Sequence, residues 1–240
     1  MENSHFTSET NSTNNLLWEL LRKQKLPEGF VAYTDFQTAG KGQTGNSWES
    51  ENGKNLMFSI LLYPNQVPFE YLFYLSQVAS IGIKNVLSTI VDGISVKWPN
   101  DIYWHNKKIG GILIENSLQA SSIKSVIGIG ININQEVFRS NAPNPVSLQL
   151  ITGQSYDRTK LLQEICESIM DIYHHSSPEA VRADYADCLY RKTGYHPYST
   201  TNEKFEAKIN SVHPDGLLEL ETKEGEIKTF YFKEVKFESE

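Results

Sequence analysis

Short apolar runs of strand length alternate with longer stretches of helical spacing along most of the chain. The short runs predict β-strands at residues 30–36, 56–63, 94–98, 102–104, 109–115 and 126–133. Apolar residues spaced three and four apart predict helices at residues 68–91, 159–173 and 178–189. Strands and helices interleaved in this order predict an α+β domain in which helices flank a mixed β-sheet.

The polar start of the chain leads directly into a further helix. Residues up to Asn15 are rich in Ser, Thr and Asn, and the leucines that follow at positions 16, 17, 20 and 21 share one helical face. Thr13 or Asn14 is the expected N-cap, because a short polar side chain there accepts a hydrogen bond from a free helical N–H. This pattern alone would make residues 12–14 a helix cap and nothing more.

The chain changes character after residues 191–194. Short alternating runs at 205–212, 217–220 and 227–232 are separated by turn signals. This pattern predicts a small all-β module, which we expect to be a barrel. The sequence therefore predicts two domains, a larger one at residues 1–189 and a small C-terminal one at residues 190–240.

The composition argues against several classes of protein. The 240 residues are 39% hydrophobic and 11% aromatic, enough to bury a core. A net charge of −7 argues against a nucleic-acid partner, and no apolar run is long enough to cross a membrane. Cys166 and Cys188 have neither CxxC nor Cys/His metal spacing, so we expect a reducing, cytoplasmic location and no metal site.

A glycine-rich loop is the first candidate for chemistry. Gly40, Gly42 and Gly45 alternate with polar residues inside the long polar stretch 37–55, where backbone N–H groups could contact an anion. The loop is not a P-loop, because position 46 is Asn where that motif requires Lys, and its glycine spacing does not match a dinucleotide-binding fingerprint. An ordinary long hairpin connection is the alternative.

Later segments of the chain add lysines near a predicted turn and glycines within predicted strands. Residues 97–101 read Lys-Trp-Pro-Asn-Asp, and a lysine pair follows at 107–108, which brings cations and a carboxylate near one turn. Glycines at 110–111, 128 and 130 would leave neighbouring strands bare, as a floor for a flat ligand requires. A solvated turn and close strand packing are the alternatives.

Taken together, these segments resemble the biotin protein ligases. The resemblance rests on residues 12–14 (Ser-Thr-Asn), on 37–48 against the family's Gly-Arg-Gly-Arg-x-Gly-Arg-x-Trp loop, on 97–101, on Lys108 with Gly110-Gly111, and on 128–132, all in the family's order. It implies a class II synthetase-like biotin/lipoate ligase fold with a small SH3-like C-terminal barrel. It also implies the monofunctional type, because we expect no room before Ser12 for the DNA-binding domain that some members carry.

The reaction implied by the resemblance has two steps. The carboxylate of biotin attacks the α-phosphate of Mg²⁺-ATP and gives biotinyl-5′-AMP and pyrophosphate. A lysine of a biotin carboxyl carrier protein domain, part of a carboxylase such as acetyl-CoA carboxylase, then attacks the mixed anhydride and releases AMP. ATP, Mg²⁺ and biotin are the implied small molecules, and we expect a monomer or a homodimer.

The resemblance also assigns roles to residues. The implied catalytic residues are Lys108, which bridges the two anions, Asp101, which deprotonates the acceptor lysine, and Lys41. The implied biotin contacts are Ser12, Thr13, Asn14, Gln37, Gly40, Lys41, Lys108, Gly111, Gly128 and Gly130. Met57 fits the wall of an aliphatic pocket, and a core position is the alternative. The implied ATP contacts are Gln43, Asn46, Trp48, Lys97, Asn100, Lys108 and Asn132, with Trp48 stacked on the adenine.

The glycine-rich loop departs from the family pattern. Where the family has three arginines, this chain has Lys41, Gln43 and Asn46, so bidentate guanidinium contacts are lost. We hypothesise that the loop holds biotinyl-AMP less tightly and closes over it through hydrogen bonds. Two other functions stay open. One is a lipoate ligase, and the other is a biotin- or nucleotide-binding module without turnover, against which the retention of Lys108 and Asp101 argues.

Overall fold

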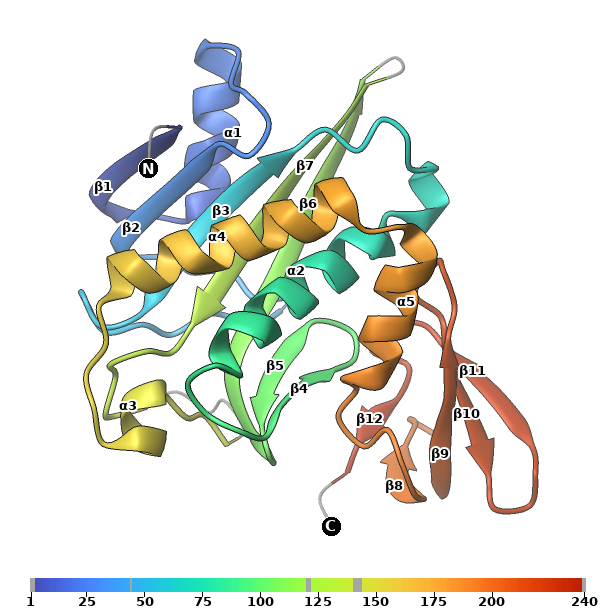
Figure 1. The fold of residues 1–240 in the computed structure, drawn as a ribbon. Helices are drawn as coiled ribbons and strands as arrows, with labels where there is room; N and C mark the ends of the chain where they lie inside the picture. The colour runs from blue at the N-terminus through green and yellow to red at the C-terminus, as the bar shows by residue number, and fades with distance from the viewer. Residues whose placement is uncertain (1–2, 44, 120–121, 140–143, 239–240) are drawn as a thin grey trace.

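The structure, a computed structural model, describes residues 3–43, 45–119, 122–139 and 144–238. Its larger sheet has seven strands in the order β1-β2-β3-β7-β6-β5-β4 (Figure 1). They are β1 (Ser4–Thr10), β2 (Val31–Gln37), β3 (Leu56–Leu62), β4 (Ile94–Lys97), β5 (Asp101–Trp104), β6 (Lys107–Gln119) and β7 (Ser122–Ile131). β1 and β2 run parallel and the other neighbouring pairs run antiparallel, so the expected mixed sheet is confirmed.

Helices cover both faces of this sheet (Figure 1). One face carries α2 (Phe73–Leu87), α4 (Arg158–His175) and α5 (Pro178–Asp187), and the other carries α1 (Thr13–Lys23). Successive residues of a strand point to opposite faces, and the buried core divides accordingly. Ile60 and Ile127 belong to the large core with α2 and α4, whereas Leu61 and Val126 pack with Leu17 of α1. Burial on both faces explains why β3 is apolar almost throughout.

Close packing between α2 and α4 depends on one glycine. A Cβ at Gly82 would lie 2.5 Å from Cγ1 of Ile169 and 3.0 Å from its Cα. Those distances are too short for any side chain, so the two helices approach through the bare backbone of α2. The described residues contain no helix with both the length and the apolar character needed to cross a membrane.

Short polar side chains fix the starts of three helices. Ser147 caps the short helix α3 (Leu148–Thr152), Asp157 caps α4 and Ser177 caps α5. Each side-chain oxygen accepts a hydrogen bond from a backbone N–H of the first turn that lacks a partner within the helix. A 3₁₀ turn, η1 (Phe69–Tyr71), precedes α2.

The C-terminal part of the chain forms a second, antiparallel sheet. Its five strands are ordered β11-β10-β9-β8-β12 (Figure 1). They are β8 (His196–Ser199), β9 (Lys204–Val212), β10 (Leu218–Thr222), β11 (Ile227–Phe230) and β12 (Lys236–Phe237). In the part of the chain that the structure describes, β11 and β12 are not paired with each other. The expected barrel is therefore an open sheet here, and the boundary at residues 189/190 stays a prediction.

Trp98 connects the two sheets. Its indole N–H donates to the carbonyl of Gly216 at 3.0 Å, and its ring lies edge-on to Phe232 with centroids 5.4 Å apart. Trp98 is only 4% exposed, so this contact is part of the core. The turn that carries the sequence 97–101 is thereby fixed against the C-terminal sheet.

Several expectations about local structure were wrong. β1 was not predicted, because it is a mostly exposed edge strand without apolar alternation that is held by its pairing with β2. The N-cap of α1 is Ser12 rather than Thr13 or Asn14, and its side chain makes no capping hydrogen bond. The helix expected over 68–91 is shorter, since α2 ends at Leu87.

Candidate active site

A cavity of about 190 Å³ lies on the α1 face of the large sheet. It is bounded by the start of α1, by the loop residues 40–43 and 45–48, which we call the flap, and by the turn between β4 and β5. The lining residues are Ser12, Thr13, Asn14, Gln37, Lys41, Gly42, Gln43, Asn46, Ser47, Trp48, Pro99, Asn100, Asp101, Lys108, Gly111, Ile112, Leu113, Gly128, Ile129 and Gly130. Most of the residues expected from the sequence are therefore brought together around one space.

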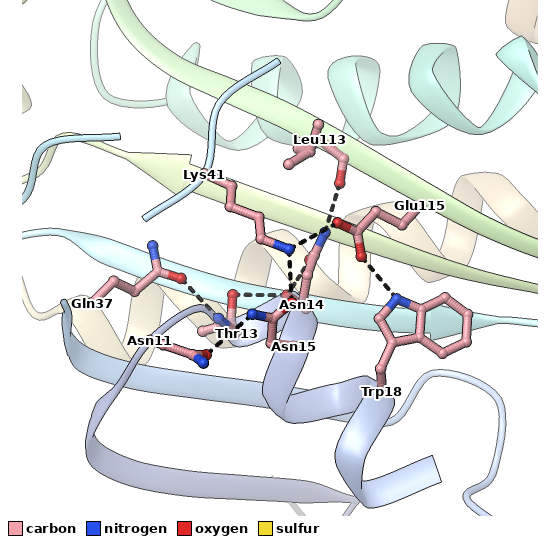
Figure 2. A network of polar contacts seen from close by, with 10 residues as sticks. Asn11, Thr13, Asn14, Asn15, Trp18, Gln37, Lys41, Leu113 and Glu115 are labelled. Carbon is pink, nitrogen blue, oxygen red and sulfur yellow. Dashed lines mark hydrogen bonds and ion pairs between the residues drawn. The ribbon is translucent and has the colours of Figure 1, made fainter. Parts of the chain in front are cut away.

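Polar side chains at the start of α1 are held in fixed orientations. Oε1 of Gln37 accepts a hydrogen bond from the backbone N–H of Thr13 at 2.8 Å, and the amide of Asn14 donates to the carbonyl of Leu113 at 3.2 Å (Figure 2). The hydroxyl of Ser59 lies 2.7 Å from both the Thr13 hydroxyl and Oδ1 of Asn14. This end of the cavity therefore presents polar groups whose positions are set before a ligand arrives.

Ser59 also belongs to this cluster, although the sequence did not predict it as a site residue. It is fully buried in β3, where every neighbouring residue along the strand is apolar. A hydroxyl within a buried apolar strand needs a hydrogen-bonding partner. A single serine within an apolar strand sequence could therefore have indicated a buried polar contact at this position. Met57 lies two residues earlier on the same strand and is 2% exposed, but it does not line the cavity.

Two glycines of β7 form the floor beneath these groups. A Cβ at Gly128 would lie 2.3 Å from Oδ1 of Asn14, and a Cβ at Gly130 would lie 2.4 Å from Cε2 of Trp48. Both glycines are therefore required by close approach of another side chain. The indole of Trp48 rests on the floor at Gly130, and its buried N–H has no hydrogen-bonding partner among the described residues.

Lys108 and Asp101 form an ion pair at the other end of the cavity. Nζ of Lys108 lies 2.6 Å from Oδ1 of Asp101, and about a quarter of each side chain is exposed, 26% and 23%. Asp101 faces Gly111 across the β5–β6 ladder, and the ion pair lies beside this glycine, where a Cβ would be 3.4 Å from Cε of Lys108 and 3.5 Å from Oδ1 of Asp101. Nζ of Lys108 also lies 5.9 Å from the centre of the Trp48 ring.

The flap is folded as a tight hairpin. Lys41 and Ser47 form an isolated β-bridge, and the N–H of Gly42 donates to the carbonyl of Asn46 at 2.9 Å. The N–H of Trp48 donates to the carbonyl of Gly40 at 2.9 Å. Those two amide groups therefore have partners inside the flap, and the long polar stretch is not structureless.

Lys41 extends from the flap toward α1 and β6. Its ammonium donates to Oδ1 of Asn15 at 2.7 Å and lies 3.5 Å from Oε1 of Glu115 (Figure 2). The expectation placed Lys41 beside the reacting carboxylate and phosphate. In this structure its charge is paired with a protein carboxylate instead.

Three predicted contacts lie outside the cavity lining: Gly40, Lys97 and Asn132. Gly40 is close by, since a Cβ there would lie 2.6 Å from the carbonyl oxygen of Trp48. Asn132 is buried and donates to the carbonyl of Val146 at 3.2 Å, while its Oδ1 has no partner among the described residues. The predicted ligand contacts of these residues stay predictions.

Lys97 is enclosed by aromatic side chains. Its Nζ lies 4.9 Å from the ring centre of Tyr103 and 5.3 Å from that of Phe237, and it donates to the Tyr103 hydroxyl at 3.1 Å. Burial lowers the pKa of Lys97, and the nearby charge of Asp101 partly opposes this. Burial likewise raises the pKa of Tyr103. Lys97 thus joins the two sheets in this structure.

A second cavity of about 500 Å³ adjoins the first. It is bounded by η1, the start of α2, β6 and the C-terminal sheet. The two cavities share Gln43, Pro99, Asn100, Ile112 and Leu113. A ligand longer than the first cavity therefore has room to extend into the second.

The described residues contain no group of three or more His, Cys, Asp or Glu side chains placed to hold a metal ion. An ion such as Mg²⁺ prefers oxygen ligands and keeps several waters and phosphates when it accompanies a nucleotide. Among the described lining residues the carboxylate is that of Asp101, and it is paired with Lys108.

Comparison with known proteins identifies the group to which this arrangement is similar. A sequence profile described as Biotin/lipoate A/B protein ligase family matches residues 6–132. The bifunctional ligase/repressor BirA of Bacillus spizizenii is 31% identical over 229 residues, which cover 90% of this chain and 68% of that protein.

Solved structures agree with the sequence comparison. A biotin protein ligase from Aquifex aeolicus in complex with biotin and ATP superposes with a TM-score of 0.80 and 27% identity, over 99% of this chain and 100% of that chain. The biotin protein ligase from Leishmania major in complex with biotinyl-5-AMP gives a TM-score of 0.69 over 96% and 99% of the two chains, and its 21% identity supports the fold alone.

Proposed function

We propose that this chain, which belongs to the Biotin/lipoate A/B protein ligase family, attaches biotin to a lysine of a carrier protein. The reaction consumes ATP. The observation that carries the proposal is the meeting of three features at one cavity. These are the polar cluster at the start of α1, the Lys108–Asp101 pair and the flap. Among the similar structures, the one from Aquifex aeolicus holds biotin and ATP.

Biotin has a polar ureido ring, an apolar body and a carboxylate tail. The polar groups of Thr13, Asn14 and Gln37, which are held in set positions, match the ureido ring together with the hydroxyl of Ser12, because they offer both donors and acceptors. The body of the ligand would lie along the glycine floor, where the Trp48 indole rests on Gly130 in this structure and would have to shift. The carboxylate would then point toward Lys108 at the other end of the cavity.

The first chemical step joins two anions. A carboxylate oxygen of biotin attacks the α-phosphorus of ATP, the bond from that phosphorus to the pyrophosphate oxygen breaks, and biotinyl-AMP and pyrophosphate result. The ammonium of Lys108 offsets the repulsion between the anions and stabilises the charge that develops on the phosphoryl oxygens. Mg²⁺, when bound with ATP, neutralises part of the phosphate charge.

The second step needs a neutral amine. The ε-amine of the acceptor lysine attacks the biotinyl carbonyl, the bond to the AMP oxygen breaks, and the nitrogen loses a proton. Asp101 is the proposed acceptor of that proton. Asp101 is paired with Lys108 in this structure, so binding of anionic substrates would turn the lysine toward them and free the carboxylate.

The remaining nucleotide contacts are proposed from their position. Gln43 and Asn100 line both cavities, and Asn46 and Trp48 lie on the flap beside the first. The shared lining supports a path for the nucleotide from the first cavity into the second. Lys97 and Asn132 would contact ATP only after a rearrangement of their present partners.

We further propose a biotin carboxyl carrier protein domain as the acceptor and the cytoplasm as the location. The BirA and biotin protein ligase names of the similar proteins support the acceptor class. The need for ATP and the two free thiols, Cys166 and Cys188, support the location. Size-exclusion chromatography with light scattering would decide between monomer and homodimer.

The decisive experiment uses the purified protein with ATP, Mg²⁺, biotin and a purified biotin carrier domain. Streptavidin should detect the carrier only when all components are present, and mass spectrometry should show an added biotinyl group. Biotin-dependent exchange of pyrophosphate into ATP should occur without the carrier. If lipoate replaces biotin with equal or greater efficiency, the chain is a lipoate ligase. If biotin binds without any exchange, it is a binding module.

A further inference from the structure

Glu115 lies at the centre of a polar network that joins three separate segments (Figure 2). Its Oε2 accepts a hydrogen bond from the indole N–H of Trp18 at 2.8 Å, and its Oε1 lies 3.5 Å from Nζ of Lys41. The same Nζ donates to Oδ1 of Asn15 at 2.7 Å. One carboxylate thus connects strand β6, helix α1 and the flap.

The two oxygens of Glu115 have different tasks. Trp18 belongs to the helix that packs on the sheet through Leu17 and Leu61, so its indole N–H is a fixed donor that orients the carboxylate. The second oxygen is then directed toward the flap. This arrangement differs from an ordinary surface ion pair, in which both side chains move freely.

Lys41 is the flap residue that this network holds. Its side chain is 44% exposed and that of Glu115 is 30% exposed, so solvent weakens their attraction without removing it. The hydrogen bond to Asn15 adds a second contact from the same ammonium. A contact of this strength favours a closed flap modestly and still allows ligands to enter.

We propose that Glu115 is a positioning residue that closes the flap by holding Lys41 against α1, so that biotinyl-AMP is retained between the two reaction steps. The inference rests on the proposed function. It assigns Lys41 to flap closure rather than to direct contact with the reacting anions. The ion pair between Lys41 and Glu115 attaches the flap to β6. This flap has Gln43 and Asn46 where arginines occur in the family pattern.

The test measures how fast biotinyl-AMP leaves the enzyme. Enzyme loaded with labelled biotinyl-AMP is chased with excess unlabelled biotin and ATP, and release is followed by rapid filtration. Glu115→Gln keeps an oxygen for Trp18 and removes the charge, so release should become about threefold to fivefold faster, as expected for loss of one partly exposed ion pair. Lys41→Gln should have a similar effect.

The pair of variants separates closure from general damage. Because both substitutions break the same contact, the double variant should release biotinyl-AMP no faster than the quicker single variant. The matched control is Asp187→Asn, which breaks an exposed ion pair with Lys192 on another part of the surface and should leave release unchanged.

The salt dependence of biotinyl-AMP release distinguishes an ion pair from a purely structural role, which would not change with salt concentration. At about 1 M salt, release from the unchanged protein should approach that of Glu115→Gln, whose own rate should change little. Slower release from Glu115→Gln, or additive effects of the two substitutions, would overturn the proposal while leaving the ligase function intact. Failure of the unchanged protein to form biotinyl-AMP would instead overturn the proposed function and the inference with it.

Discussion

Nζ of Lys108 lies 2.6 Å from Oδ1 of Asp101, which pairs the two residues proposed for successive steps of one reaction. Asp101 is paired across the ladder with Gly111, and a Cβ at that glycine would lie at ordinary contact distance from both partners, 3.5 Å from Oδ1 of Asp101 and 3.4 Å from Cε of Lys108. Each group neutralises the other when no substrate is bound. Binding of anions near Lys108 would exchange this partner for the substrate, and the order of the two steps would follow from that exchange.

Replacing Lys108 with Ala should greatly reduce adenylate formation. We expect biotin-dependent exchange of pyrophosphate into ATP to fall by about 10²–10³, the range for loss of one group that stabilises developing charge. The exposed neighbour Lys107 provides the matched control, since Lys107→Ala removes the same charge outside the cavity lining. Near-normal exchange in Lys108→Ala, with an unchanged circular dichroism spectrum, would contradict the assignment.

Asp101→Asn should affect transfer more than adenylate formation. The amide cannot accept the proton of the acceptor amine, so transfer from preformed biotinyl-AMP to the carrier should slow by about 10²-fold. Single-turnover measurements of each step on the same enzyme preparation give the two rates. Equal loss in both steps would mean that Asp101 acts mainly by orienting Lys108.

Restoring arginines in the flap tests whether the present flap retains its ligand weakly. Gln43→Arg combined with Asn46→Arg should slow release of biotinyl-AMP by about tenfold, because guanidinium groups add charge-assisted hydrogen bonds to phosphate. Gln154→Arg adds one such charge at an exposed position outside the cavity lining and serves as the control. Unchanged release in the double variant would show that other contacts limit dissociation.

The effect of substituting a floor glycine on biotin binding should depend on the space available for a Cβ at that position. A Cβ at Gly128 or Gly130 would displace Asn14 or Trp48, whereas a Cβ at Gly111 would lie at ordinary contact distance, 3.4 Å, from Cε of Lys108. We therefore expect Gly128→Ala and Gly130→Ala to weaken biotin binding by about tenfold or more, and Gly111→Ala to weaken it less. Isothermal titration calorimetry measures all three affinities. Equal affinities would show that the floor can shift freely.

The two thiols should make stability depend on pH in alkaline solution. Burial raises the pKa of Cys166 to about 12 and that of Cys188 to about 11, whereas an unfolded thiol ionises near pH 9. Above about pH 9 the unfolded state therefore binds fewer protons than the folded state, and the free energy of unfolding falls as pH rises. Urea denaturation at pH 7.5 and 10 should show a smaller fall in the Cys166→Ala, Cys188→Ala variant. An identical fall would contradict this origin.

The sequence predicts the site better than it predicts its internal contacts. Thr13, Asn14, Asp101 and Lys108 were expected to line one site, and they do line one cavity. Their partners were not expected, because those contacts join residues far apart in the chain. Glu115 is the clearest case. It contacts Lys41 and Trp18, which lie 74 and 97 positions away in the chain, and its local sequence does not distinguish it from any other charged residue on a strand.

The fold shows a similar division. Apolar periodicity identified the buried strands, including β3 and β7, and the helices α4 and α5, where burial imposes a regular pattern. It failed for β1, which is held by backbone pairing to β2 and carries little buried surface. It also implied a closed barrel, because strand-length runs and turns do not specify whether the outer strands of a sheet meet.

The position of β7 has a consequence for hydrogen exchange. This strand is the middle one of the large sheet and is paired on both edges from Ser125 to Ile131, so the amide protons of that part should exchange with solvent only when the whole domain unfolds. Flap amides need only a local opening. Residues of both regions line the cavity, so a ligand bound there should protect the flap directly and protect β7 by raising the free energy of global unfolding. Deuterium uptake would thus report flap opening and domain stability separately in one experiment.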